Sequence, residues 1–381
     1  MKKIISLNIQ GSAAASLLGS TKPILTAVFE RGERYQIGPH TLLNLHGNYR
    51  EMGRQYGTLL KFELNELKSY LKKQPPINNE ETNNLILANA EKHYNYYPQE
   101  FKDLIEGMAE TSGLSFAEQQ LLSFLEFFPE IIPPKNAPQN QCTCIAINKD
   151  QSVDGKLIFG RNYDWFPNHE KMKHLLTTTI FHADGAKNAT ALINYPGSLK
   201  ATTAMNSHGI FLAINSEDRK NDPAKGPLLL KLQAFLRNNN NLAEFQENML
   251  ASQSNRPIII NVADDNEAFS DEYSLDNVKF VHNFFVATNH FVHPDWHKKA
   301  KGDTVERRNN VLAKFTNPDE KINLDQLKKI LETPIKDGGV SFPIKNSMFR
   351  VIAVPQDLKL WLCVPNVYNW TEIDLKPFFK N

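Results

Sequence analysis

"NQCTCIAI", residues 140–147, marks the point where the sequence changes from an irregular segment to a strand. The preceding run, PEIIPPKNAPQ (129–139), is rich in proline, which neither a helix interior nor a central strand accepts. From Ile145 onward apolar side chains alternate, as in a strand that buries one face. Two of the chain's three cysteines, Cys142 and Cys144, stand at the start of this strand. We expect these two side chains to point to opposite faces, and we expect no disulfide between them.

The composition limits the classes of function. The chain has 381 residues, enough for one large domain or two ordinary ones. The 43 basic and 42 acidic side chains nearly cancel, so no basic excess indicates a nucleic-acid partner. Three cysteines are too few for a disulfide framework, and no second cysteine pair or histidine pair completes a zinc site. We therefore expect no metal, no cofactor and no nucleic-acid partner.

The first twenty residues, MKKIISLNIQGSAAASLLGS, have a weak likeness to a secretory signal, because two lysines precede an uncharged stretch. Polar residues such as Asn8 and Gln10 interrupt the apolar run, which is also too short to span a bilayer. Whether these residues are a signal is left open, and a cytoplasmic location is slightly favoured over a periplasmic or secreted one. No membrane span is expected elsewhere.

The spacing of apolar residues predicts two unlike parts. From about residue 50 to 128 the spacing is helical, and Ser115 with Glu118 has the spacing of a capping box. After residue 142 short β-rich runs alternate with glycine-containing turns. Later helices are predicted at about 226–241, 242–252, 304–315 and 324–333, and the chain closes with strands at about 347–355 and 358–366. This order favours two β-sheets enclosed by helices, an α+β architecture.

Several short motifs follow Cys142 and Thr143 in order along the chain. They are GRNYD (160–164), AMNSHGIFLAINSED (204–218), VATNHF (286–291) and DTVERRNNVL (303–312). Upstream lies LHGNYREMGRQYGTLL (45–60). In this combination and order the chain resembles the cysteine N-terminal nucleophile hydrolases, within them the choloylglycine hydrolase and penicillin acyltransferase-like group. The resemblance spans roughly residues 40 to 365.

The resemblance implies a four-layer αββα sandwich preceded by a mainly helical segment. It divides the chain into a pro-segment or α-segment, residues 1–141, and a catalytic region, residues 142–381. The bond between Gln141 and Cys142 would be cut by the thiol of Cys142 itself. The freed α-amine would have an ordinary pKa of about 7.7–8.0, which suits a general base near neutral pH.

The resemblance also assigns the other site residues. Arg161 would favour the thiolate, and Asp164 would anchor the amine or Arg161. Asn215 and Asn289 would supply amide donors to an oxyanion. Arg307 would orient the site or bind substrate, although Thr304 stands where the group has serine and Arg308 is an alternative to Arg307. A structural alternative also exists for each of these residues, such as a surface ion pair for Arg161 and Asp164.

The implied reaction is hydrolysis of a linear, non-peptide amide of a small N-acyl substrate through a thioester on Cys142. An acyltransferase that passes the acyl group to an amine is the nearest alternative, since the same thioester serves both reactions. An uncleaved binding or scaffold protein of the same fold is a second alternative. A Cys-His protease using His208, His290 or His293 is a third. The acyl group, the amine and a homo-oligomeric state are left open.

Overall fold

The structure is a computed structural model. It describes residues 5–6, 22–73, 78–124, 142–164, 170–218, 220–282, 285–300, 302–315, 320–344 and 346–380. Gln141 and nearly all of the first twenty residues lie outside the described residues, so the predicted cleavage bond and signal are not described. Within the described residues no helix is long and apolar enough to cross a membrane.

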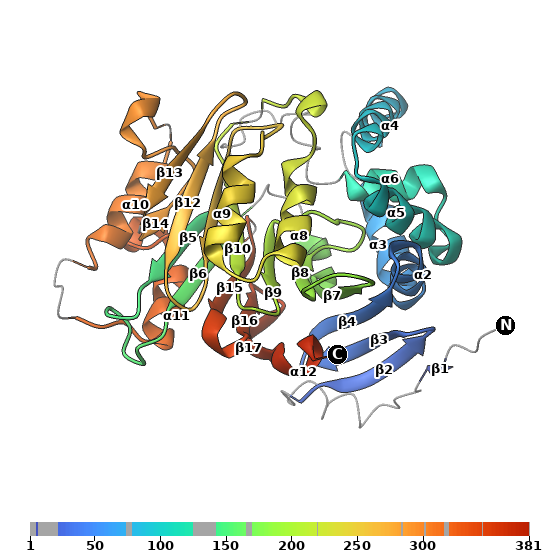
Figure 1. Cartoon of the computed structure of the whole chain (residues 1–381), viewed down its shortest axis with the longest axis horizontal. Coiled ribbons are helices and arrows are strands. Elements are labelled where there is room, and N and C mark those ends of the chain that lie inside the picture. Colours follow the sequence, from blue (N-terminus) through green and yellow to red (C-terminus); the bar gives the residue numbers. More distant parts are fainter. Residues whose placement is uncertain are drawn as a thin grey trace.

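The larger of the two sheets extends across the whole molecule (Figure 1). In spatial order its described strands are β1 (Ile5–Ser6), β2 (Ile24–Phe29), β3 (Gly32–Ile37), β4 (His40–Gly47), β7 (Thr177–Ala183), β8 (Thr190–Asn194), β9 (Thr203–Asn206), β10 (Phe211–Ser216), β11 (Ile258–Ala263), β12 (Ala268–Tyr273) and β13 (Val278–His282). Neighbouring strands are antiparallel except β4 and β7, which pair in parallel. This parallel pair joins the segment before Cys142 to the segment after it.

The smaller sheet contains the predicted site strand. Its described order is β14 (Val286–Ala287), β5 (Thr143–Ile147), β6 (Ile158–Asp164), β15 (Ser347–Val354), β16 (Lys359–Val364) and β17 (Tyr368–Asp374). Its pairs are all antiparallel. A large cluster of buried apolar side chains from both sheets fills the space between them, so the two sheets pack face to face.

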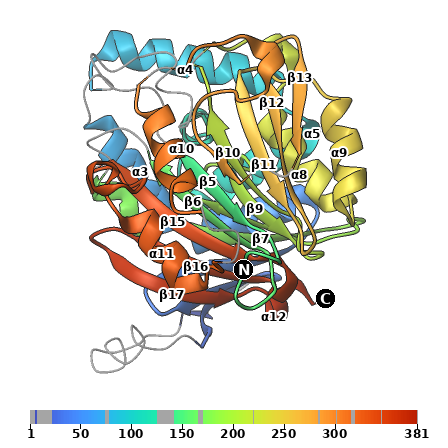
Figure 2. The same cartoon turned by 90° about the vertical axis from the view of Figure 1, so that its left-hand side faces the viewer.

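Helices cover the outer faces of both sheets, which confirms the predicted αββα layering (Figure 2). Helices α8 (Leu228–Asn238) and α9 (Leu242–Leu250) lie on the large sheet, where Tyr273 of β12 donates a hydrogen bond to the carbonyl of Met249. Helices α10 (Thr304–Leu312) and α11 (Leu324–Glu332) lie on the small sheet. Helix α11 packs closely on β6 at Gly160, where a Cβ would come within 3.1–3.2 Å of the side chains of Leu327 and Leu331.

The segment before Cys142 contains the predicted helices and also strands that the sequence did not indicate. The helices are α2 (Tyr49–Leu59), α3 (Lys61–Lys72), α4 (Glu80–Asn95), α5 (Gln99–Ser112) and α6 (Phe116–Ser123). The predicted capping box of Ser115 and Glu118 starts α6. Strands β2, β3 and β4 precede these helices and extend the large sheet. Residues 22–47 are therefore part of the sandwich.

The remaining described helices are short. They are α12 (Lys376–Phe379) and the 3-10 helices η2 (Glu170–Leu175), η3 (Pro223–Lys225), η4 (Pro294–Trp296), η5 (Ile335–Asp337) and η6 (Pro355–Asp357). Of these, η4 lies in the segment after β14 that also carries the predicted site residue Asn289.

Candidate active site

The antiparallel pairing of β5 with β6 fixes where Cys142 lies. Thr143 pairs with Asn162, so Cys142 stands beside the end of β6 that carries Asp164. Cys142 and Cys144 both belong to the cluster between the sheets, whereas Ile145 packs toward α10 and α11. The expectation that the two cysteines point to opposite faces was wrong, because residues two apart on a strand share a face. No disulfide joins them, as expected.

Arg161 is a fully buried cation beside the Cys142 sulfur. One terminal nitrogen lies 3.8 Å from Sγ of Cys142 and donates to the carbonyl of Ile214 at 2.8 Å. The other donates to the carbonyl of Thr202 at 2.5 Å and to the hydroxyl of Thr203. The guanidinium group is therefore held by β9 and β10 of the opposite sheet, and its charge can stabilise negative charge on the sulfur.

Asp164 is a buried acid in the same place. Its backbone carbonyl lies 3.8 Å from Sγ of Cys142. Neither carboxylate oxygen has a hydrogen bond of good geometry within the described part of the chain, although Ser347 lies near enough to lower the carboxyl pKa. Burial outweighs this contact and those of Arg350, Arg307 and Arg161, and raises the pKa of Asp164 to about 7.

The backbone carbonyl of Cys142 accepts two hydrogen bonds from predicted site residues. Asn215 Nδ2 donates to it at 3.0 Å, and Arg307 donates at 2.7 Å. Asn215 Nδ2 also donates to the carbonyl of Ala287 at 3.3 Å, so both N–H groups of this amide are used. The two side chains therefore hold the backbone of Cys142 between the sheets.

Arg307, rather than Arg308, reaches the site. It is fully buried at the start of α10 and also donates to the hydroxyl of Thr143 at 2.8 Å and to Oδ1 of Asn289 at 3.0 Å. Its Nε donates to Asp303 at 3.2 Å, which supplies a compensating charge. Arg307 thereby links Cys142 to Asn289.

Three hydrogen bonds fix the position of Asn289. Its Nδ2 donates to the carbonyl of Ser216 at 2.7 Å, its Oδ1 accepts from Arg307, and its backbone N–H donates to the hydroxyl of Thr304 at 2.8 Å. Thr304 stands where the resembling group has serine, and its hydroxyl accepts this hydrogen bond from Asn289. His290 lies 2.9 Å from the same hydroxyl, and burial lowers its pKa to about 4.

The other two cysteines have surroundings that favour a neutral thiol. Cys144 is fully buried and donates to Oδ1 of Asn215 at 3.0 Å, and burial raises its pKa to about 12. Burial also raises the pKa of Cys363. Within the described residues no hydrogen bond joins His208, His290 or His293 to Cys142.

Two further residues support the site and were not predicted from the sequence. Asn261 donates to Oδ1 of Asn215 at 2.9 Å and accepts from Ser270 at 2.7 Å, and Arg350 lies near enough to Asp164 to lower its pKa. Asn261 interrupts the apolar run IIINVA, and Arg350 interrupts SMFRVIAV. A polar side chain within a fully apolar strand was the signal that could have found them.

The described residues contain no cluster of three or more histidine, cysteine, aspartate or glutamate side chains that could hold a metal ion. The chemistry that the arrangement supports depends on a thiol, a neighbouring cation, a buried carboxylate and amide donors. The other five predicted site residues are connected to Cys142 directly or, for Asn289, through Arg307.

The model of the acyl-coenzyme A:6-aminopenicillanic acid acyl-transferase family matches residues 151–366, which is more than half of the chain. The matched range contains the predicted site residues except Cys142. A curated protein, dcd1B of Dictyostelium discoideum, is 25% identical over 170 residues, covering 38% of this chain and 32% of that protein. The match therefore spans about a third of that relative's length.

Among solved structures, an N-acylethanolamine-hydrolyzing acid amidase ortholog of Caenorhabditis elegans is 15% identical with a TM-score of 0.43, covering 56% of this chain and 92% of that chain. A variant of conjugated bile acid hydrolase from Clostridium perfringens is 14% identical with a TM-score of 0.43, covering 62% and 93%. Penicillin V acylase from Agrobacterium tumefaciens is 13% identical with a TM-score of 0.38, covering 61% and 86%. These scores are too low to carry a conclusion about this chain.

Proposed function

Because the chain belongs to the acyl-coenzyme A:6-aminopenicillanic acid acyl-transferase family, we propose that it is an N-terminal nucleophile enzyme. It cleaves a linear, non-peptide amide through an acyl-thioester on Cys142. The observation that carries this proposal is that the predicted site residues, from distant parts of the chain, converge on Cys142. They are Arg161, Asp164, Asn215, Asn289 and Arg307.

The enzyme first cuts its own chain before Cys142. The thiol attacks the carbonyl carbon of Gln141, the C–N bond between the two residues breaks as the C–S bond forms, and the nitrogen takes the thiol proton. Water then hydrolyses this thioester. The products are the carboxylate of Gln141, the free thiol and the free α-amine of Cys142.

The surroundings of Asp164 support a role for the freed amine. A buried carboxylate without a good hydrogen-bond partner among the described residues is costly, and a neighbouring ammonium group would compensate it. An α-amine titrates at a pKa of about 7.7–8.0 when unperturbed, so it can exchange a proton with the thiol near neutral pH. Asp164 would hold this amine beside the sulfur.

Turnover then uses the same groups. The α-amine takes the thiol proton, the sulfur attacks the substrate carbonyl, and the substrate amine leaves with that proton as the acyl-thioester forms. Water attacks the thioester with the α-amine again as base, which releases the acid. Among the described residues Asn215 Nδ2 donates to two backbone carbonyls and Asn289 Nδ2 to one, so Asn289 is the predicted oxyanion residue that can donate a further hydrogen bond.

We propose further that residues 1–141 stay bound after the cut. Strand β4 pairs with β7 along its length, from Thr41 with Thr177 to Gly47 with Ala183. Lys200 is buried and donates to the carbonyl of Ser123 at 2.7 Å. Because the early strands and helices share one apolar core with the rest of the sandwich, separation would expose that core to water.

Transfer of the acyl group to an amine is the second candidate function. The family match favours it, because the matched family is described as an acyl-transferase. In this case an amine replaces water in attacking the thioester, and the product is a new amide. Incubation of the enzyme with an amide substrate and an added amine distinguishes the reactions by whether acid or the exchanged amide accumulates.

Intact-mass spectrometry of the purified protein tests the proposal. We expect the wild-type protein to give a fragment that begins at Cys142, the Cys142→Ala variant to stay whole, and the matched Cys144→Ala variant to be cut. A wild-type chain that stays whole under all conditions would instead favour the uncleaved scaffold protein. A cut at another bond would also overturn the proposed nucleophile.

A further inference from the structure

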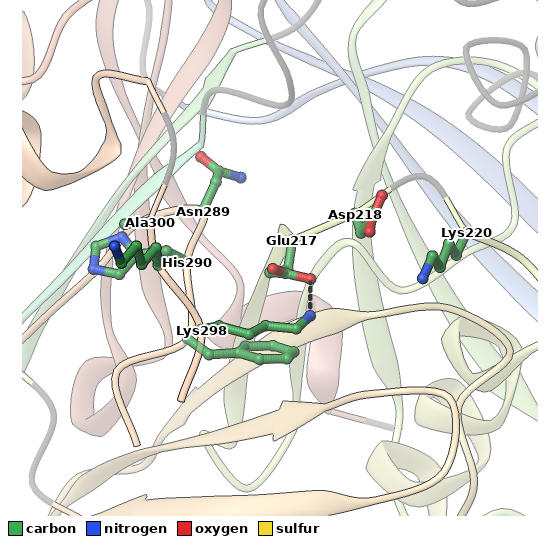
Figure 3. A pocket seen from close by; sticks show the side chains of 9 residues that line it. Glu217, Asp218, Lys220, Asn289, His290, Lys298 and Ala300 are labelled. Carbon is green, nitrogen blue, oxygen red and sulfur yellow. Dashed lines mark hydrogen bonds and ion pairs between the residues drawn. The ribbon is translucent and has the colours of Figure 1, made fainter. Parts of the chain in front are cut away.

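A charged pocket lies beside the site, between the end of β10 and the segment after β14 (Figure 3). Its volume is about 280 Å³, and its lining includes Glu217, Asp218, Lys220, Phe291, Lys298 and Lys299. Asn289 belongs to both the pocket and the site, since it accepts from Arg307, which donates to the carbonyl of Cys142. Two hydrogen bonds therefore connect the pocket wall to the nucleophile.

One wall of the pocket is fixed by a buried acid on β12. Glu272 is 1% exposed, and its carboxylate accepts from the backbone N–H groups of Val292 at 2.6 Å and His293 at 3.1 Å. It also accepts from the indole N–H of Trp296 at 2.8 Å, and Trp296 stacks on Phe291 with 4.7 Å between ring centroids. These contacts hold the segment after Asn289 in place, so the pocket is formed before a ligand arrives.

The lining has an excess of positive charge. Three lysines face two acidic residues, and Glu217 already pairs with Lys298 at 3.0 Å (Figure 3). Burial lowers the pKa of His290 to about 4, so its ring is neutral at pH 7. Lys220 and Lys299 form no ion pair with another described residue, and both side chains are exposed to solvent.

An apolar acyl chain would gain little from a wall of charged side chains, since their heads would lose water without a partner. We propose that this pocket receives the amine part of the amide substrate and that this part carries a carboxylate, recognised by Lys220 and Lys299. The inference rests on the proposed function. The pocket would favour amides whose amine part carries a carboxylate, as in an amino acid, over amides of neutral amines.

Equilibrium binding of two sulfonamides to the wild-type protein tests the inference. Both carry the same octyl chain, and one ends in a carboxylate (N-octylsulfonylglycine) where the other ends in a hydroxyl (N-octylsulfonylethanolamine). A thiol does not cleave a sulfonamide, so binding is measured without turnover. We expect tighter binding of the carboxylate probe, with a preference that falls as salt is added, because the lysines are exposed.

Variants of the two lysines test whether these side chains cause the tighter binding of the carboxylate probe. The Lys220→Gln, Lys299→Gln double variant should bind the carboxylate probe about two- to thirtyfold more weakly, at an exposed ion pair's usual strength for each lysine, and should bind the hydroxyl probe as before. Lys336→Gln, in exposed η5, is the matched control and should change neither affinity. Equal binding of both probes by the wild type, or an unchanged preference in the double variant, would overturn the inference. A protein that prefers the carboxylate probe but cleaves no linear amide, whether its amine part is charged or neutral, would overturn the proposed function and leave the pocket assignment standing.

Discussion

Cys142 and Cys144 lie two residues apart on the same side of one strand, but their surroundings differ. Cys144 is enclosed, hydrogen-bonded to Asn215 and paired in register with Arg161 inside the sheet, and its pKa is raised to about 12. Cys142 precedes the first paired residue of β5, with a terminal nitrogen of Arg161 3.8 Å from its sulfur. Burial of a thiol therefore does not by itself distinguish the two residues, and the proposed nucleophile is the one at the strand end, with the Arg161 guanidinium beside its sulfur.

The largest expected effect tests this comparison directly. Cys142→Ala should abolish turnover of any amide that the wild type cleaves, because the variant lacks the sulfur that forms the thioester. Cys144→Ala should retain substantial turnover, since the Cys144 thiol donates to Asn215 and has no described hydrogen bond to the Cys142 sulfur. Steady-state assays of both purified variants check the prediction. An inactive but correctly folded Cys144→Ala variant, judged by circular dichroism, would mean that the wrong sulfur has been chosen.

A smaller effect is expected from the residue that holds the backbone of Cys142. Arg307→Lys keeps the charge but loses the planar fork that contacts Cys142, Thr143 and Asn289 together. The loss of hydrogen bonds from a charged donor should lower kcat/KM by about ten- to a hundredfold.

Arg308→Lys is the matched control, because Arg308 lies next in the sequence and makes none of these contacts. Arg308 is half-buried, and kcat/KM of this variant should fall by less than about fivefold, because lysine keeps the charge and no contact to Cys142, Thr143 or Asn289 is lost. Equal losses in the two variants would show that general perturbation of α10, not the contacts of Arg307, lowers activity.

The smallest expected effect concerns Asp164 in the uncut chain, where no freed amine is present. The folded-state pKa is raised to about 7 from an ordinary value of 3.8, so the folded chain keeps this proton in the pH range where the unfolded chain loses it. The contribution of Asp164 to stability is full below about pH 4 and is lost as the pH rises to about 7. Cys142→Ala should therefore lose stability relative to Cys142→Ala, Asp164→Asn across this range.

Urea unfolding of the two uncut proteins at several pH values measures this difference. The buried Asp271, whose pKa burial raises to about 8, is present in both proteins and cancels. Replacing Asp150, an exposed residue, by asparagine in the Cys142→Ala background is the control and should leave the pH dependence unchanged. A difference that does not vary between pH 4 and 7 would contradict the burial of an uncompensated carboxyl.

The sequence predicted most of the later elements because their signals are local. Alternating apolar residues mark β5, and the capping box of Ser115 and Glu118 marks the start of α6. Strands β2 to β4 were missed because their pattern is weak: the side chains of β2 are all half-buried, and those of β3 are half-buried except at its two ends. Their place is decided by the parallel pairing of β4 with β7, a contact distant in sequence that no local pattern carries.

The site residues came from a resemblance between motifs, and the structure adds the contacts that motifs do not contain. The choice between Arg307 and Arg308 was open because adjacent basic residues in a helix differ only in the face they occupy. Asn215 of β10 donates to the carbonyls of Cys142, at the start of β5, and of Ala287 in β14. These three segments are far apart in the sequence, so no local pattern could have predicted the two hydrogen bonds.

The central claim is that the α-amine of Cys142 serves as the general base, and blocking this amine tests it most directly. Residues 1–141 and 142–381 would be produced as separate chains and assembled, once with Cys142 as the first residue and once with one uncleavable residue before it. The blocked enzyme keeps its thiol, Arg161 and Asn289 but has a peptide nitrogen in place of the amine. The account predicts that turnover falls by roughly a hundred- to ten-thousandfold, the usual contribution of general-base catalysis. Equal turnover by the two assemblies would contradict it.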